Sequence, residues 1–77
     1  MLRSESMKLT VELEREEDGR YIAEVLELAG VMVYGDTREQ ALARVQVLAL
    51  RVLADKLEGG EFPETPLTVS FETASAA

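Results

Sequence analysis

Hydrophobic and polar residues alternate strictly from residue 7 to residue 14. The apolar set is Met7, Leu9, Val11 and Leu13, and the polar set is Lys8, Thr10, Glu12 and Glu14. Because successive side chains of an extended chain point to opposite sides, this pattern predicts a strand with one buried and one wet face. Residues 1–6 carry no such pattern, so we expect a flexible N-terminal arm there.

Two further strands are expected in an antiparallel meander with the first. The dipeptide Asp18-Gly19 is a strong turn signal and precedes residues 20–26, which are rich in β-branched and aromatic side chains. A third β-prone run covers residues 31–34 and stops at Gly35. The alternating residues 67–72 predict a fourth strand, and residues 73–77 are expected to form a flexible tail.

A long helix is predicted between the third and fourth strands. Thr37 and Gln40 fit a capping box, with Asp36 as the competing N-cap, and the helix is expected to run to Glu58 before Gly59-Gly60. One arc of the helical wheel is apolar and should cover the sheet. It consists of Ala41, Leu42, Val45, Leu48, Ala49, Val52, Leu53 and Leu57.

Four more apolar residues of this helix fall outside that arc: Ala43, Val47, Leu50 and Ala54. They are either isolated surface hydrophobes, which are common, or a contact between protomers. Their helical spacing and the small size of the domain favour the contact. We therefore expect a homo-oligomer, a dimer or a tetramer, with these four residues at its interface.

The order of elements predicts an α+β fold with two layers. The β-β-β-α-β chain should form one four-stranded mixed sheet in the order 3-2-1-4, with the helix on one face. A single domain is expected over residues 7–72.

Composition narrows the function. The 77 residues carry a formal net charge of −7 and contain neither histidine nor cysteine. The usual general base, the thiolate nucleophile and the usual zinc ligands are therefore missing, and we expect no enzyme, cofactor or metal site. The basic residues are scattered, which argues against direct nucleic-acid binding and favours a basic protein partner. Without an apolar span or a signal peptide, a cytoplasmic protein with no membrane association is expected.

Other groups with chemical potential have simpler explanations. The acidic group Glu14, Glu16, Glu17 and Asp18 is expected to be a solvated turn rather than a metal site. Asp36 could pair with Glu24 or Glu12 in a carboxylate-metal nuclease, but helix capping already accounts for it. For Tyr21 and Tyr34 we expect core packing with the hydroxyl groups reaching water.

Three motifs together resemble the HicB-type antitoxin family. They are the hairpin residues 19–25 (GRYIAEV), the turn residues 27–31 (ELAGV) and the helix entry at residues 35–42 (GDTREQAL). The resemblance implies a partial ribonuclease H-like fold of β-β-β-α-β order that lacks the nuclease's catalytic acids. It also implies a partner, since family members usually neutralise HicA, a small basic RNA-cleaving toxin.

The chain departs from the family pattern in two places. Ala29 and Val31 stand where the family commonly has proline and cysteine, and the chain ends shortly after the fourth strand, before a DNA-binding segment. These features predict a stand-alone HicB-like domain that does not bind an operator. The leading hypothesis is a non-catalytic protein-interaction domain, the antitoxin of a HicA-like toxin. The alternative is an oligomeric structural or regulatory module without a toxin partner.

Overall fold

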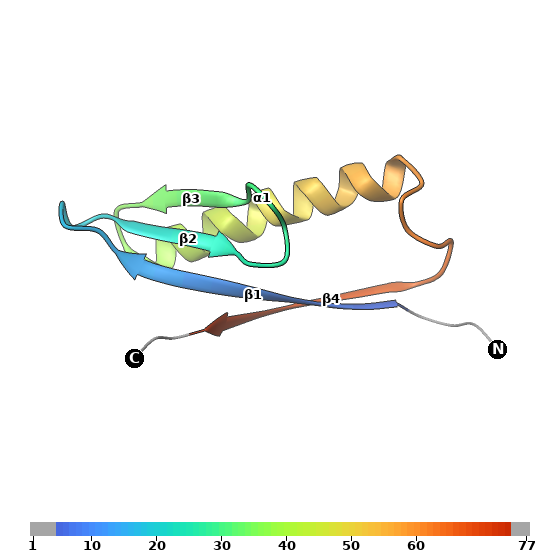
Figure 1. Ribbon diagram of the computed structural model, residues 1–77, viewed down its shortest axis with the longest axis horizontal. Helices are drawn as coiled ribbons and strands as arrows, with labels where there is room; N and C mark the ends of the chain where they lie inside the picture. Colours follow the sequence, from blue (N-terminus) through green and yellow to red (C-terminus); the bar gives the residue numbers. More distant parts are fainter. Residues whose placement is uncertain (1–4, 75–77) are drawn as a thin grey trace.

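The computed structural model describes residues 5–74 and contains one sheet and one helix (Figure 1). Residues 1–4 and 75–77, most of the expected arm and tail, lie outside the described residues. The elements are β1 (Glu5–Arg15), β2 (Tyr21–Val25), β3 (Met32–Gly35), α1 (Arg38–Glu58) and β4 (Leu67–Ala74).

The predicted topology is confirmed. The four strands lie in the order β3-β2-β1-β4, with β1, β2 and β3 antiparallel and β4 parallel to β1. α1 packs on one face, against β3, β2 and β1, and its backbone stays farther from the edge strand β4. The molecule is therefore a two-layer α+β domain.

The first and the last strand of the chain, β1 and β4, are longer than their sequence pattern indicates. β1 begins at Glu5, inside the expected arm, and β4 continues to Ala74, inside the expected tail. The reason is mutual pairing, because Glu5 is the ladder partner of Leu67 and Glu12 is the ladder partner of Ala74. Ladder hydrogen bonds extend a strand beyond the stretch in which one face is apolar.

The turn into α1 depends on a close backbone approach. Thr37 is the N-cap: its hydroxyl accepts a hydrogen bond from the backbone N–H of Gln40 at 3.0 Å. The Gln40 side chain returns to the backbone N–H of Asp36, one residue before the cap, at 2.7 Å. Gly35 lies against the first turn, where an added Cβ would stand 2.5 Å from the backbone nitrogen of Ala41. Only glycine fits there.

The core lies between α1 and the adjacent face of the sheet. Its fully buried residues come from β1, β2, α1 and the β2–β3 loop: Leu9, Val11, Ala23, Val25, Leu28, Val31, Ala41, Val45, Ala49 and Leu53. Seven of the eight residues of the predicted apolar arc are buried or half-buried.

Leu57 is the exception, and its assignment to the core-facing arc was wrong. Its side chain is 46% exposed, whereas Leu53, one turn earlier, is 2% exposed. Each step of four residues along α1 turns the side chain by a further angle of about 40°, and Leu57 is four such steps from Ala41, so it points away from the face that the buried residues share.

Within residues 5–74, the structure has no helix that is both long enough and apolar enough to cross a membrane.

Candidate functional site

The face of the sheet opposite α1 is not covered by any described element, and we call it the open face. The strand registers determine its members. They are Ser6, Lys8, Thr10, Glu12 and Glu14 of β1, Ile22 and Glu24 of β2, Met32 and Tyr34 of β3, and Thr68, Ser70, Glu72 and Ala74 of β4.

A shallow hollow of about 190 Å³ lies on this face, over β1, β2 and the start of β3. Ile22 and Met32 form its apolar part, and Glu12, Glu14, Glu16 and Glu24 line the rest. Pockets for small molecules are usually about 300 to 1,000 Å³ and mainly apolar. This hollow is smaller, and four of its six lining residues are glutamates, so one long basic side chain from a protein surface would fit it better than a small molecule would.

Two of these glutamates are held side by side by the sheet. Glu12 and Glu24 are direct ladder partners in β1 and β2, and both are exposed on the open face. Within residues 5–74 neither carboxylate has an ion-pair partner. Like charges directly opposite each other destabilise a sheet. The Glu12–Glu24 pair therefore destabilises the isolated domain, and a cation bound between the two carboxylates would remove this repulsion.

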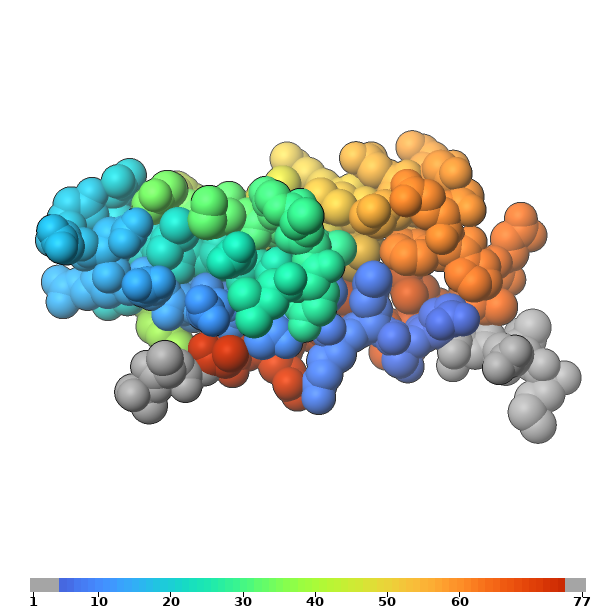
Figure 2. Space-filling view, in the orientation of Figure 1, coloured from blue at the N-terminus to red at the C-terminus, as the bar shows by residue number. Residues whose placement is uncertain are grey.

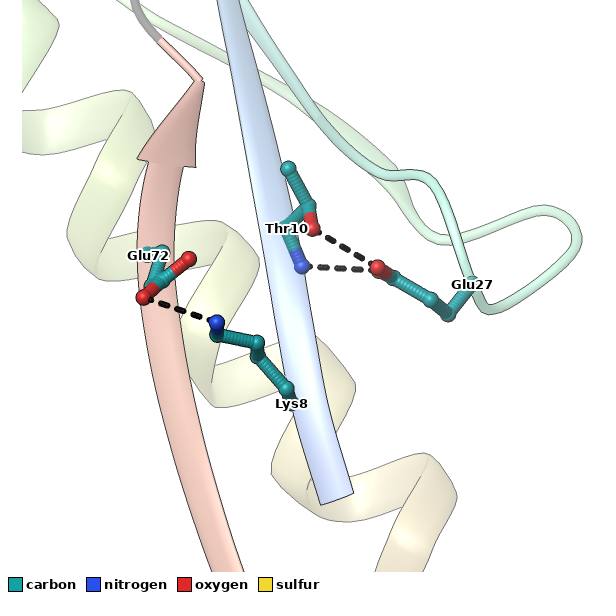
Figure 3. Close-up of polar contacts among 4 residues, drawn as sticks. All are labelled: Lys8, Thr10, Glu27 and Glu72. Carbon is teal, nitrogen blue, oxygen red and sulfur yellow. Dashed lines mark hydrogen bonds and ion pairs between the residues drawn. The ribbon is translucent and has the colours of Figure 1, made fainter.

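Three other polar residues of the open face, Lys8, Thr10 and Glu72, are held in polar contacts (Figure 3). Lys8 forms an ion pair with Glu72 across the β1–β4 ladder, at 3.2 Å. Glu27, in the β2–β3 loop, accepts hydrogen bonds from the backbone N–H and the hydroxyl of Thr10, both at 2.7 Å. These contacts leave the glutamates of the hollow as the uncompensated charge of the face.

Tyr34 also belongs to the open face, and its expected position in the core was wrong. It is 41% exposed, because its ladder partner is Ile22, which faces away from α1. The Arg20 guanidinium lies 4.5 Å from the centre of its ring, within the range of a cation–π contact. Tyr21, the other tyrosine, is partly buried against the core as expected.

The acidic turn is tied to its own backbone. Asp18 accepts hydrogen bonds from the backbone N–H and the Nε of Arg20, at 3.0 and 2.8 Å. These bonds, the backbone one first, lower the pKa of the Asp18 carboxyl from its usual value. The carboxylate is thus a turn-forming group.

The nuclease alternative requires Asp36 to converge with another carboxylate. The sheet separates them, because Glu24 is the partner of Met32 at the start of β3, whereas Asp36 follows Gly35 at its end. Among the described residues, no three acidic side chains lie close enough together to hold a metal ion.

The four predicted interface residues lie on the outer side of α1, facing away from the sheet. All four are exposed, Val47 at 50% and Leu50 at 49%. They do not adjoin the open face, because the sheet and the buried side of α1 lie between the two surfaces. The domain therefore has two separate exposed surfaces with apolar residues.

The sequence did not identify the apolar residues of the open face. The alternation in residues 7–14 had indicated a polar side of β1, including Glu12 and Glu14. Ile22, Met32 and Tyr34 join that side only through the registers of β2 and β3. In the sequence they look like ordinary members of buried strands, so no local signal identifies them.

The chain was compared with models of protein families, with curated proteins and with solved structures. None of the three comparisons finds a match. A proposal of function therefore rests on the surfaces described above together with the resemblance of the three sequence motifs.

Proposed function

We propose that the chain is a non-catalytic, HicB-like protein-interaction domain that binds a small basic protein of the HicA-like kind through its open face. The observation that carries the proposal is the hollow, where Ile22 and Met32 are surrounded by four uncompensated glutamates. An arginine or lysine of a partner would lay its aliphatic stem on the apolar centre and its charged head among the carboxylates.

The distribution of charge supports the same partner. α1 contains four basic and three acidic residues and carries a net charge of +1, so the rest of the chain carries −8. A basic protein approaching the domain would be attracted toward the sheet side rather than toward the helix. Such steering would speed association and weaken with added salt.

The unfavourable Glu12–Glu24 pair supports a binding role over a purely structural one. A sheet selected only for stability gains by placing opposite charges at directly opposed positions. Departures from that rule concentrate at functional sites, where a partner supplies the missing group. A cation from the partner would relieve the repulsion on binding.

The test looks for a HicA-like protein encoded beside this chain, and the absence of such a gene would count against the toxin partner. The full chain is co-expressed with it to measure rescue of growth, and binding is measured by calorimetry. Glu24→Lys should weaken binding by about tenfold or more, because it replaces a group of the hollow with a repulsive charge. Glu64→Lys makes the same charge change in the exposed loop after α1 and should weaken binding only about two- to threefold.

Two further results would count against the proposal. Absence of both binding and rescue by the full chain would remove the toxin partner. Equal weakening by the two variants would show that the net charge of the chain, rather than the open face, determines affinity.

A further inference from the structure

The outer side of α1 carries a regular apolar stripe. With Leu57 added to the four exposed residues described above, the members are Ala43, Val47, Leu50, Ala54 and Leu57. Their spacings of four, three, four and three residues are those of a heptad seam, the pattern by which one helix packs along another. We call this set the outer stripe. Figure 2 shows the C-terminal half of α1, yellow to orange, on the outside of the molecule.

We propose that the outer stripe binds a second copy of this chain, with the two α1 helices antiparallel about a twofold axis at Leu50. In this register Leu50 meets its own counterpart. Ala43 faces Leu57 of the second copy, and Val47 faces Ala54 of the second copy. On either side of the axis each large side chain thus meets a small one, so the two ends of the helix pair have the same separation.

A parallel pair would fit less well. It would place Leu57 against Leu57 at one end and Ala43 against Ala43 at the other. The two helices would then be held apart at one end and leave a gap at the other, and such gaps lose packing contacts. The order of side-chain sizes along the stripe therefore favours the antiparallel pair.

Charged residues beside the stripe agree with this register. Arg44 comes next to Glu58 of the second copy, and the twofold axis repeats the pair at the other end. Arg44 uses one N–H group to donate to the carbonyl oxygen of Tyr34 at 3.0 Å and retains other donors for this contact. Arg51 approaches its own counterpart near the axis, and Asp55, one turn further along α1, offsets that repulsion.

A second copy suits this surface better than a basic protein does. The charge of α1, +1, neither attracts a strongly basic partner nor opposes a second α1. The pairing would also bury three aliphatic side chains that are now about half exposed, Val47, Leu50 and Leu57. Both open faces would lie on the outside of the dimer, so self-association is independent of the proposed partner binding.

The proposed dimer is tested by measuring the molecular mass of the full chain in solution. Light scattering should give a dimer for the native chain and a monomer for Leu50→Asp, while circular dichroism shows that the variant remains folded. Leu26→Asp is the matched control, because Leu26 is 52% exposed on the β2–β3 loop and should leave the dimer intact. A native chain that is monomeric at about 100 μM, which implies a Kd weaker than roughly that value, overturns the proposal.

Disulfide cross-linking tests the register, and the chain offers a clean background because it contains no cysteine. In the antiparallel pair the two copies of residue 43 are 14 positions apart along the helices, or about 21 Å, so Ala43→Cys alone should not form a covalent dimer. Combined with Leu57→Cys it should form one rapidly. Rapid cross-linking of the single variant would overturn the antiparallel arrangement.

Discussion

Glu27 takes the place of a β2 carbonyl oxygen as the acceptor for the backbone N–H of Thr10. The carboxylate accepts hydrogen bonds from both the backbone N–H and the hydroxyl of Thr10 at 2.7 Å, across 17 positions of sequence. Leu26 still donates its backbone N–H to the carbonyl oxygen of Thr10, but the chain then turns away from β1. The Glu27 side chain thus satisfies a β1 donor that would otherwise lack a protein acceptor.

These bonds make the Glu27 carboxylate a pH-dependent contributor to stability. The backbone N–H of Thr10 and then its hydroxyl lower the pKa of Glu27 from its usual value. A lowered pKa in the folded state means that the stabilisation is present above the unfolded pKa, about 4.3, and is lost as the pH falls through the folded value. Urea unfolding of the native chain at pH 7 and near pH 3 should show this loss.

Glu27→Gln should lower stability at neutral pH by less than about 1 kcal/mol, because the carboxylate is exposed and water screens it. The variant should also lose less stability on acidification than the native chain does. Glu64→Gln, in the exposed loop, serves as the control. It should lose as much stability between pH 7 and pH 3 as the native chain does. If the native chain and Glu27→Gln lose the same stability between pH 7 and pH 3, the contact with Thr10 does not contribute to the pH dependence of stability.

Replacing Glu24 by lysine should stabilise the isolated domain. The change converts the Glu12–Glu24 repulsion into an attraction between direct ladder partners, which is worth roughly 0.2 to 1 kcal/mol. Glu12→Lys should do the same, whereas the double variant restores a like-charge pair and should lose most of the gain. Thermal unfolding at low and high salt measures these differences. A gain in stability that does not change with salt concentration would contradict the electrostatic explanation.

Gly35→Ala should destabilise the domain by about 1 to 3 kcal/mol, because the new Cβ would stand 2.5 Å from the Ala41 backbone and force β3 away from α1. Gly59→Ala is a milder comparison, since the nearest atom to its Cβ is 3.3 Å away. Chemical denaturation of both variants measures the two losses in the free energy of unfolding. A Gly35→Ala variant as stable as the native chain would mean that this junction adapts easily.

Leu53 and Leu57 lie one turn apart on α1 and should respond very differently to truncation. Leu53→Ala removes a core side chain and should cost about 2 to 5 kcal/mol. Leu57→Ala should cost less than about 0.5 kcal/mol when measured in the monomeric Leu50→Asp background. In the native background Leu57→Ala should also weaken the dimer, and light scattering would detect that loss.

The elements of this fold could be read from local sequence because each has a local cause. Alternation identified β1, the Asp18-Gly19 turn identified the hairpin, and Thr37 with Gln40 marked the start of α1. The order β3-β2-β1-β4 then followed from general rules of chain connection. Gly35 and Thr37, which contributed to the family resemblance, serve close packing and capping in the structure.

What the sequence could not supply depends on long-range pairing. Tyr34 was assigned to the wrong side because a four-residue strand gives too little alternation to choose a face, and the register with Ile22 decides it. The hollow of the open face likewise requires three strands to be aligned. Leu57 was misplaced because it lies at the edge of the predicted apolar arc, and the sequence does not show how wide a face of α1 the core covers.

The parallel ladder between β1 and β4 has a consequence for biogenesis. β1 is an interior strand of the sheet, yet the partner on one of its sides is synthesised last among the described elements, 62 positions later for the pair of Glu5 and Leu67. While the ribosome is still producing α1, the nascent chain exposes that side of β1 as an unpaired edge, a template for intermolecular strand addition. A stalled or truncated product that lacks residues 67–74 should therefore aggregate, although it contains nearly the whole core.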